Sequence, residues 1–317
     1  MARLSIVIPC YNSDKTIGPV VDELVEVLGD SYEYEVILVN DGSTVQLWEA
    51  IRGLVDKYNP IVRGIRFAKN FGQHAALMAG YREATGDIIV QMDDDGQCNP
   101  KGIFTLLDKM DEGYDVVFAR YPNHKESLFR RMGSELNRRM CISFLGMPKQ
   151  LRPMSFSAMR RYVIDEMIRY ERPYPYVGGL MYRATSNLCD VDIEHRDRVA
   201  GESNYNIIKL FRLWLNGFTA FSVKPLEASA IVGAFVAVLG FIFAIAIIIR
   251  KIAGLSVLAG WSSMISILLI LGGLNMVMLG IVGEYIGRIY ICLNNAPQYV
   301  IRDKYFPEEE NENKKEK

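Results

Sequence analysis

Two long stretches without a single charged residue constrain the fold of this 317-residue chain more than any other feature. They cover residues 228–249 and 252–283, and each is long enough to cross about 30 Å of hydrocarbon as a helix. A core helix of a soluble domain would normally carry a polar face, and these stretches carry none. The sequence therefore predicts two transmembrane helices, at about 228–249 and 263–286, joined as a hairpin.

The charges around the two stretches predict their orientation. Basic residues flank the outer ends at Lys209, Arg212, Lys224, Arg288, Arg302 and Lys304, whereas the connection holds only Arg250 and Lys251. Basic flanks favour the cytoplasmic side of a membrane. We therefore expect a multi-pass protein of the cell inner (cytoplasmic) membrane, with its soluble part in the cytoplasm.

Charge and cysteine content exclude several classes of protein. The net charge is −1, so there is no electrostatic case for a nucleic-acid partner. The five cysteines are scattered and form no C-x-x-C pair. This argues against a disulfide framework and a zinc site, and it fits a reducing compartment.

Residues 1 to about 120 alternate short apolar strands with helical patterns. Strands are predicted at 4–8, 35–39, 62–67 and 87–92, with helices at 16–28, 48–57 and 73–84 between them. This order is typical of an α/β fold with a doubly wound, mostly parallel sheet. In such sheets ligands bind beyond the carboxyl ends of the strands.

An acidic cluster, Asp93-Asp94-Asp95-Gly96-Gln97, follows the fourth predicted strand. In extended backbone, alternate side chains project to one side, so Asp93, Asp95 and Gln97 can converge. Two carboxylates and an amide oxygen suit Mg²⁺ or Mn²⁺. The alternative is an acidic turn that caps the following segment.

Three further polar segments follow predicted strands: Pro9-Cys10-Tyr11-Asn12, Asp41-Gly42-Ser43 and Lys69-Asn70-Phe71-Gly72. Each alone could be ordinary turn chemistry, because Asn, Asp, Gly and Ser favour turns. Together with the acidic cluster they would line one edge of the sheet, which favours a ligand site.

These motifs carry a resemblance to a known family. I-V-I-P-C-Y-N, V-N-D-G-S, K-N-F-G-Q-H-A-A and A-T-G-D-I-I-V-Q-M-D-D-D-G-Q resemble family 2 glycosyltransferases of the GT-A fold, which are inverting enzymes that use nucleotide sugars. H-R-D-R-V-A-G-E-S-N-Y, L-W-L-N-G-F, F-S-V-K-P-L and G-E-Y-I-G-R-I-Y extend the resemblance to the polyprenyl-phosphate branch. That branch includes dolichol-phosphate mannose synthases and undecaprenyl-phosphate glucose and aminoarabinose transferases. The resemblance covers almost the whole chain apart from the acidic tail.

The resemblance implies roles for individual residues. By this resemblance, the residues expected to bind the nucleotide sugar are Pro9, Tyr11, Asn12, Asp41, Asp93, Asp94, Arg198 and Ser203. Asp93 and Asp95 become the catalytic residues, and Asp95 and Gln97 the metal ligands. A cation and an arginine would neutralise charge on the leaving nucleoside diphosphate.

The chain departs from the family pattern at the expected base. Many relatives carry Asp-Phe-Arg where this chain has Ser155-Phe156-Ser157, and their paired acid in V-D-D-G-S is Asn40-Asp41 here. A lipid phosphate with a second pKa near ~6 is largely dianionic at pH 7 and is already a nucleophile. Such an acceptor does not require a protein base, so no base is assigned.

The segment 125–146 is basic and apolar at helical spacing. It is typical of an interfacial helix at the membrane surface, and the alternative is a surface helix packed on the soluble domain. By resemblance to the dolichol-phosphate mannose synthases, Arg120, Arg130 and Ser134 match positions that bind the lipid phosphate.

Small residues in the second predicted span permit close helix contact: Gly273, Gly280, Gly283 and Gly287. They indicate a homo-oligomer, such as a tetramer, assembled through the hairpins. Asn275 would bond across a helix interface or to its own backbone, and Glu284 and Arg288 have the spacing of an ion pair.

The expected organisation is a cytoplasmic GT-A domain (1–227), two transmembrane helices (228–290) and a cytoplasmic tail (291–317) with a disordered end. The expected activity is transfer of a sugar, glucose or a 4-amino-4-deoxy-arabinose derivative, from a UDP-sugar to undecaprenyl phosphate, for cell-envelope glycan or lipid A modification. One alternative is a family 2 transferase with another acceptor, such as a processive synthase, although Q-x-x-R-W is absent. The other is a non-catalytic membrane scaffold that retains the fold.

Overall fold

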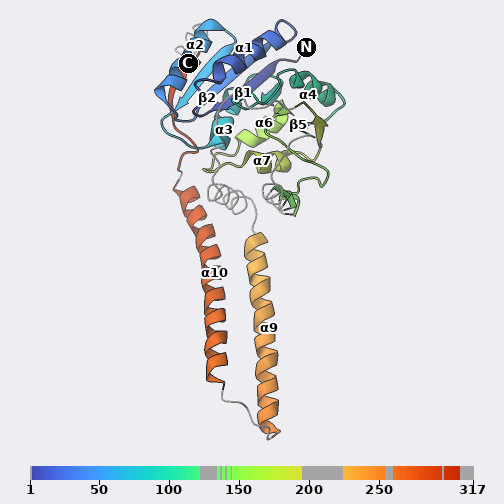
Figure 1. Cartoon of the computed structure of the whole chain (residues 1–317), viewed down its shortest axis with the longest axis vertical. Coiled ribbons are helices and arrows are strands. Elements are labelled where there is room, and N and C mark those ends of the chain that lie inside the picture. Colours follow the sequence, from blue (N-terminus) through green and yellow to red (C-terminus); the bar gives the residue numbers. More distant parts are fainter. Residues whose placement is uncertain are drawn as a thin grey trace. The chain divides into compact units, whose positions relative to one another are not determined.

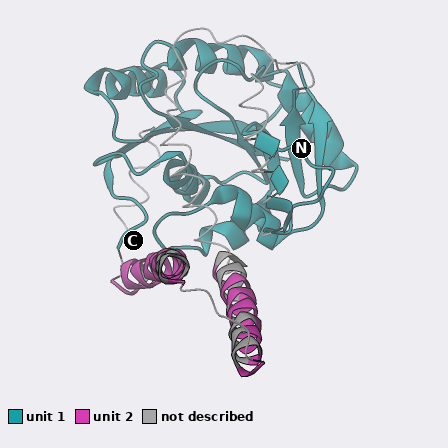
Figure 2. Ribbon diagram, turned by 60° about the horizontal axis from the view of Figure 1, so that its bottom comes forward, with its two compact units in different colours: residues 1–214, 296–317 teal, residues 215–295 magenta. Residues whose placement is uncertain are grey.

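The computed structural model describes residues 2–121, 134–135, 138–139, 141–143, 145–194, 224–253, 260–294 and 296–307. The chain divides into two compact units, one of residues 1–214 with 296–317 and one of residues 215–295 (Figure 2). The expected boundaries lay at 227 and 290. The first unit therefore contains residues 296–317, which are most of the expected tail, whereas residues 291–295 fall in the second unit.

The first unit is built on an eight-stranded mixed sheet in the order β7-β5-β6-β4-β1-β2-β3-β8. The strands are β1 (Leu4–Cys10), β2 (Tyr34–Asn40), β3 (Val62–Phe67), β4 (Ile88–Gln91), β5 (Val116–Arg120), β6 (Ser157–Arg160), β7 (Leu188–Asp192) and β8 (Ile301–Tyr305). The four central strands are parallel, whereas β6 and β8 pair antiparallel with their neighbours. The predicted α/β, mostly parallel sheet is confirmed.

Helices alternate with the strands. They are α1 (Ile17–Leu28), α2 (Val45–Lys57), α3 (Gln73–Glu83), α4 (Gly102–Asp111), α6 (Arg161–Ile168) and α7 (Val177–Ala184). The start of α2 has a local cause, because the Thr44 side chain accepts a hydrogen bond from the Leu47 N–H at 3.3 Å. Every strand and helix predicted between residues 4 and 92 is present, so local patterning was enough to place them.

The sheet is covered on both faces. Alternate residues of β1 point to opposite sides, and Leu4, Ile6 and Ile8 join a buried cluster with α1, α2 and α4. On the other face α3 lies so close that a Cβ on Gly80 would be 2.3 Å from a methyl group of Val7. Figure 1 shows α1 and α2 on one side of the central strands and α3 on the other. The fold is thus a three-layer α/β arrangement.

The edge strand β8 was not predicted. It pairs antiparallel with β3, where Ile65 lies opposite Lys304, and its residues alternate between half-buried and exposed. Three of its five residues are charged, so the sequence lacks the apolar run of a buried strand. Pairing with the exposed edge of β3, rather than its own hydrophobicity, holds it in place.

The described residues of the second unit form two long helices, α9 (Lys224–Ile252) and α10 (Trp261–Leu293). They touch each other, since a Cβ on Gly233 would lie 2.6 Å from Cε of Met278. Within the described part of the chain, one helical segment, Ile270–Ile291, is long and apolar enough to cross a membrane. The apolar stretch found in α9, Ile231–Ile242, is shorter.

Candidate active site

Four polar loops meet at one edge of the sheet because the strands before them are parallel and in register. Cys10 at the end of β1 lies opposite Asn40 at the end of β2, and Asn40 lies opposite Arg66 near the end of β3. On the other side of β1, Val7 lies opposite Gln91 at the end of β4. The loops after these strands therefore share an edge, as the sequence predicted.

The loop after β1 is fastened to two others. The backbone N–H of Tyr11 donates to the Asp94 carboxylate at 3.0 Å. The N–H of Asn12 donates to Ser43 Oγ at 2.9 Å, and that hydroxyl donates to Oδ1 of Asn12 at 2.7 Å. The Tyr11 side chain itself is 51% exposed. Its backbone is fixed while its ring faces solvent, which suits a residue that contacts a ligand.

Asp41 ties the loop after β2 to the loop after β3. Its carboxylate accepts hydrogen bonds from the N–H groups of Phe71 at 2.7 Å and Gly72 at 2.9 Å. Burial raises the pKa of this carboxyl from 3.8 to about 6, and the two hydrogen bonds oppose the shift. Asp41 therefore supports the loop after β3, and its expected contact with the nucleotide stays a prediction.

Gly42 lets these two loops touch. Its φ of +62° lies in the left-handed region, and a Cβ here would be 2.1 Å from the carbonyl carbon of Lys69 and 2.4 Å from the Asn70 nitrogen. No side chain fits at this contact. The D-G-S motif therefore has a steric cause in addition to its turn chemistry.

Asp93 is held by side chains from two other elements. The hydroxyl of Ser155, just before β6, donates to one carboxylate oxygen, and Nε2 of Gln73 donates to the other at 3.1 Å. Burial raises the pKa of Asp93 to about 6, and the hydrogen bond from Ser155 opposes that shift. Ser155, which replaces the expected base, contacts the acidic cluster directly.

The next two aspartates differ in their surroundings. Burial raises the pKa of Asp94, which accepts the Tyr11 N–H. Asp95 Oδ1 accepts the backbone N–H of Gln97 at 3.1 Å, which closes a tight turn. The cluster forms the turn that was the alternative interpretation, and its role as a metal site stays a prediction.

The side chains of the acidic cluster can be compared with the ligands that a divalent cation needs. Among the described residues, no three His, Cys, Asp or Glu side chains converge as ligands of a metal ion. Mg²⁺ is commonly held by one or two carboxylates together with substrate phosphates, rather than by a protein cage. The carboxylates of Asp93 and Asp95 and the amide oxygen of Gln97 are hard oxygen donors, so their chemistry fits such a shared site.

The remaining predicted site residues do not all lie in the four polar loops. Pro9 lies in β1 beside this edge. Arg120, expected to bind a lipid phosphate, pairs with Asp192 at 2.5 Å and Asp190 at 3.4 Å across β5 and β7. Ser134 is exposed. The expected residues Arg130, Arg198 and Ser203 lie outside the described residues, as does most of the segment 125–146.

Two residues at the start of α3 were not singled out from the sequence. Gln73 holds Asp93, and the ring of His74 meets the ring of Tyr176 edge-on, with centroids 5.4 Å apart. Burial lowers the pKa of His74 to about 4, so this imidazole is neutral at pH 7. Gln73 and His74 lie in the motif K-N-F-G-Q-H directly after the third strand, and this position could have indicated that they lie near the site.

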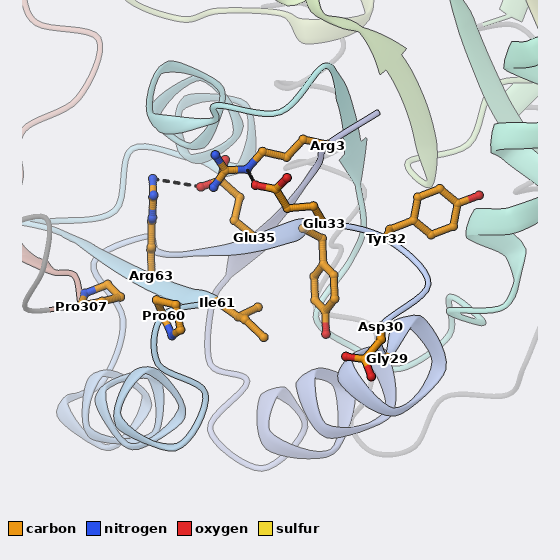
Figure 3. A pocket seen from close by; sticks show the side chains of 11 residues that line it. Arg3, Gly29, Asp30, Tyr32, Glu33, Glu35, Pro60, Ile61, Arg63 and Pro307 are labelled. Atoms are coloured by element: carbon orange, nitrogen blue, oxygen red, sulfur yellow. Dashed lines mark ion pairs between the residues drawn. The ribbon is translucent and has the colours of Figure 1, made fainter. Parts of the chain in front are cut away.

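A pocket of about 540 Å³ lies at the opposite edge of the sheet, where β1, β2 and β3 begin (Figure 3). Two ion pairs lie in its lining: Arg63 pairs with Glu35 at 2.9 Å and Arg3 with Glu33 at 3.4 Å. Glu35 also accepts the Ser5 hydroxyl at 2.6 Å. These contacts bind the strand starts together, and the polar loops lie elsewhere.

The mixed sheet with helices on both faces defines an α/β class of protein, and comparison with known proteins gives the family. The sequence model described as "Glycosyl transferase family 2" matches residues 5–168, so the chain belongs to this family and is a glycosyltransferase. The match runs from β1 to α6 and includes the acidic cluster.

Individual relatives match over nearly the whole chain. A Bacillus subtilis (strain 168) protein named "Uncharacterized glycosyltransferase YkcC" is 34% identical, covering 96% of this chain and 94% of the relative. Undecaprenyl-phosphate 4-deoxy-4-formamido-L-arabinose transferases are similar too. That of Proteus mirabilis (strain HI4320) is 30% identical, covering 99% of this chain and 97% of its own length.

Solved structures support the fold. Glucosyl-3-phosphoglycerate synthase from Mycobacterium tuberculosis, in complex with phosphoglyceric acid, is 18% identical with a TM-score of 0.52, covering 69% of this chain and 79% of that chain. The same enzyme with Mn²⁺, UDP-glucose and phosphoglyceric acid is 19% identical with a TM-score of 0.51, covering 69% and 78%. At this identity the likeness identifies the fold only.

Proposed function

We propose that this enzyme transfers a sugar from a UDP-sugar to undecaprenyl phosphate. The observation that carries the proposal is the meeting of Tyr11, Asp41 and the acidic cluster 93–97 at one sheet edge, where a nucleoside diphosphate would bind. Relatives named as undecaprenyl-phosphate transferases align far beyond the family match, through the two long helices, which supports a shared acceptor.

The acidic cluster would receive the diphosphate end of the donor. Asp95 and Gln97, with Asp93, would hold a Mg²⁺ or Mn²⁺ ion, which when bound neutralises charge on the diphosphate oxygens. Pro9, Tyr11, Asn12 and Asp41 would hold the nucleoside, and Arg198 and Ser203 would contact the diphosphate. This arrangement stabilises the departing nucleoside diphosphate, which is where negative charge develops.

The acceptor needs little activation. A phosphate monoester near pH 7 is mostly dianionic, so its oxygen can attack the anomeric carbon without giving up a proton. The task of the protein is to align that oxygen opposite the leaving diphosphate. This agrees with Ser155, which stands where relatives have an aspartate and which holds Asp93 through its hydroxyl. Arg120, Arg130 and Ser134 would bind the lipid phosphate.

Membrane attachment follows from the same acceptor. We propose that α9 and α10 both cross the inner membrane, with the first unit in the cytoplasm and the hairpins in contact between copies. Uncharged stretches of 22 and 32 residues support this, as does the span-length segment Ile270–Ile291. Undecaprenyl phosphate is confined to the membrane, so an enzyme anchored there meets its acceptor by lateral diffusion.

For the sugar we propose a chemical class and a second candidate. Relatives named for 4-deoxy-4-formamido-L-arabinose favour a UDP-linked amino sugar of that class, with UDP-glucose as the second candidate. Both donors share the nucleotide and the diphosphate that the acidic cluster would bind. They differ at the sugar, and the loops that contact the sugar decide between them.

The test uses purified full-length protein, Mg²⁺ or Mn²⁺, undecaprenyl phosphate, and labelled UDP-glucose, UDP-4-deoxy-4-formamido-L-arabinose and GDP-mannose. We expect chloroform-soluble label with one UDP-sugar. Label in a polymer or on a water-soluble acceptor would identify a family 2 transferase with another acceptor. UDP binding without any transfer across the panel would favour the non-catalytic scaffold.

A further inference from the structure

An aromatic loop, residues 170–176, joins α6 to α7 in the first unit. Its Tyr174 has a φ of +58°, a conformation that a bulky residue rarely adopts, and its side chain is 55% exposed. Its last residue, Tyr176, places its ring against His74. Backbone strain beside a ligand site persists only where surrounding contacts hold it, so the contacts of this loop are informative.

The loop is held by a side chain from the far end of the sequence. Nε2 of Gln298 donates to the carbonyl oxygens of Tyr170 at 3.1 Å and Arg172 at 3.0 Å. Gln298 is 7% exposed, and both donor hydrogens of its amide are used. A buried amide with two carbonyl partners fixes the backbone of the loop at two points.

Arg82, near the end of α3, completes the attachment. It donates to Oε1 of Gln298 at 3.0 Å and to the Tyr299 hydroxyl at 2.8 Å. Its other terminal nitrogen donates to the carbonyl oxygens of Ile168 and Tyr170, each at 3.2 Å. One guanidinium therefore joins α3, the segment before β8 and the aromatic loop.

The same helix reaches the acidic cluster. Gln73 at its first turn donates to Asp93, and the neighbouring His74 meets Tyr176 at the end of the aromatic loop. The loop is thus attached at its start by Gln298 and Arg82. Its end contacts His74, which is the chain neighbour of Gln73, the residue that holds Asp93. The loop borders the diphosphate end of the proposed donor site.

We propose that Gln298 is a positioning residue for donor binding: through its two hydrogen bonds it sets the aromatic loop 170–176 beside the acidic cluster. The inference rests on the proposed function for its ligand, a UDP-sugar. It makes donor affinity depend on a segment that follows the two long helices in sequence.

The test is Gln298→Glu. The substitution keeps the shape and the acceptor facing Arg82, and it replaces the amide donor with a carboxylate oxygen facing two carbonyl oxygens. The matched control is Lys304→Ala, which removes the 2.6 Å pair with Glu83 and so another tie between the C-terminal segment and α3, without touching the loop.

The first readout does not depend on activity. We expect Q298E to speed amide hydrogen exchange in residues 170–176 and trypsin cleavage after Arg169, whereas K304A leaves both at the wild-type level. Equal exchange in Q298E and wild type would overturn the proposal. If Q298E lowers the melting temperature more than K304A does, Gln298→Ala, which creates no charge, is compared with K304A in the same way.

The second readout is kinetic. We expect the donor KM of Q298E to rise about tenfold, which is the order of magnitude for losing the two hydrogen bonds that hold the loop. The kcat and the KM for undecaprenyl phosphate should stay within about twofold of wild type. A loop that loosens with an unchanged donor KM would refute the positioning role. Wild-type protein that makes no glycolipid would instead refute the proposed function.

Discussion

The Ser155 hydroxyl donates a hydrogen bond to the Asp93 carboxylate. Ser155 comes from the segment before β6, and Asp93 follows β4, to which β6 is paired antiparallel. The sheet therefore brings the residue that replaces the expected base onto the first aspartate of the acidic cluster. This contact makes Ser155 a support for the cluster.

Removal of this hydroxyl should impair transfer. In Ser155→Ala, the Asp93 carboxylate loses this hydrogen bond and keeps the one from Gln73. We expect kcat/KM to fall roughly 10- to 100-fold, the range for a hydrogen bond to a charged group. Ser155→Thr retains the hydroxyl and should recover most of the activity. Full activity in the alanine variant would show that Asp93 needs no support from Ser155.

Gly42→Ala should loosen the site without touching a carboxylate. The new methyl group would overlap the backbone of Lys69 and Asn70, so the two loops must separate. We expect a loss of at least about 2 kcal/mol in unfolding free energy and weaker UDP binding. Gly146→Ala is the control, because its φ is +74° but no atom lies within 4 Å of its added methyl group. Similar melting temperatures for the two variants would contradict a steric role.

The sequence predicted the parts of this structure that local patterns control. The strands and helices up to residue 92 each carry their own periodicity, and the polar loops follow from where those strands end. The acidic cluster was placed at the ligand edge for the same reason.

Local sequence patterns could not predict contacts between segments that are far apart in the chain. Arg82 and Gln298 are 216 positions apart, and no pattern in either neighbourhood points to the other. Likewise Arg120 has the motif of a lipid-phosphate ligand, but only the pairing of β5 with β7 shows that Asp190 and Asp192 lie against it.

Asp41 gives a pH dependence to the stability of the fold. Its pKa is raised by burial from 3.8 to about 6, so the folded chain holds this proton more tightly than the unfolded chain. The contribution of Asp41 to the free energy of unfolding is fully present below about pH 4, and it is lost as the pH rises through about 6. A pKa shift from 3.8 to about 6 limits this contribution to at most about 3 kcal/mol.

Asp41→Asn removes that titration. We expect its unfolding free energy, measured by urea denaturation from pH 4 to 7, to decline less with rising pH than that of the wild type. The two curves are compared by slope, because Asn also loses a hydrogen bond to Phe71 or Gly72 at every pH. Parallel curves would mean that Asp41 titrates as an ordinary exposed carboxylate.

Asp95→Ala should abolish transfer. The proposed cation contributes several kcal/mol of charge stabilisation, which corresponds to at least about a hundredfold in rate. Mn²⁺-dependent retention of UDP should be lost, whereas membrane insertion and the melting temperature should not change. Asp111→Ala, at the exposed end of α4, is the control for removing a carboxylate. Retained activity in the Asp95 variant would exclude it as a metal ligand.

Arg130→Ala should act on the acceptor half of the reaction. If Arg130 binds the lipid phosphate, its loss removes a charge-assisted hydrogen bond, and we expect the KM for undecaprenyl phosphate to rise about tenfold while the donor KM stays within twofold. Arg139→Ala is the control on the same segment, because Arg139 is exposed and pairs with Glu135 at 3.2 Å. It removes an equal charge, so it reports any general loss of attraction to an anionic membrane surface. An equal rise in both KM values for the Arg130 variant, or the same acceptor effect in both variants, would count against a specific phosphate contact.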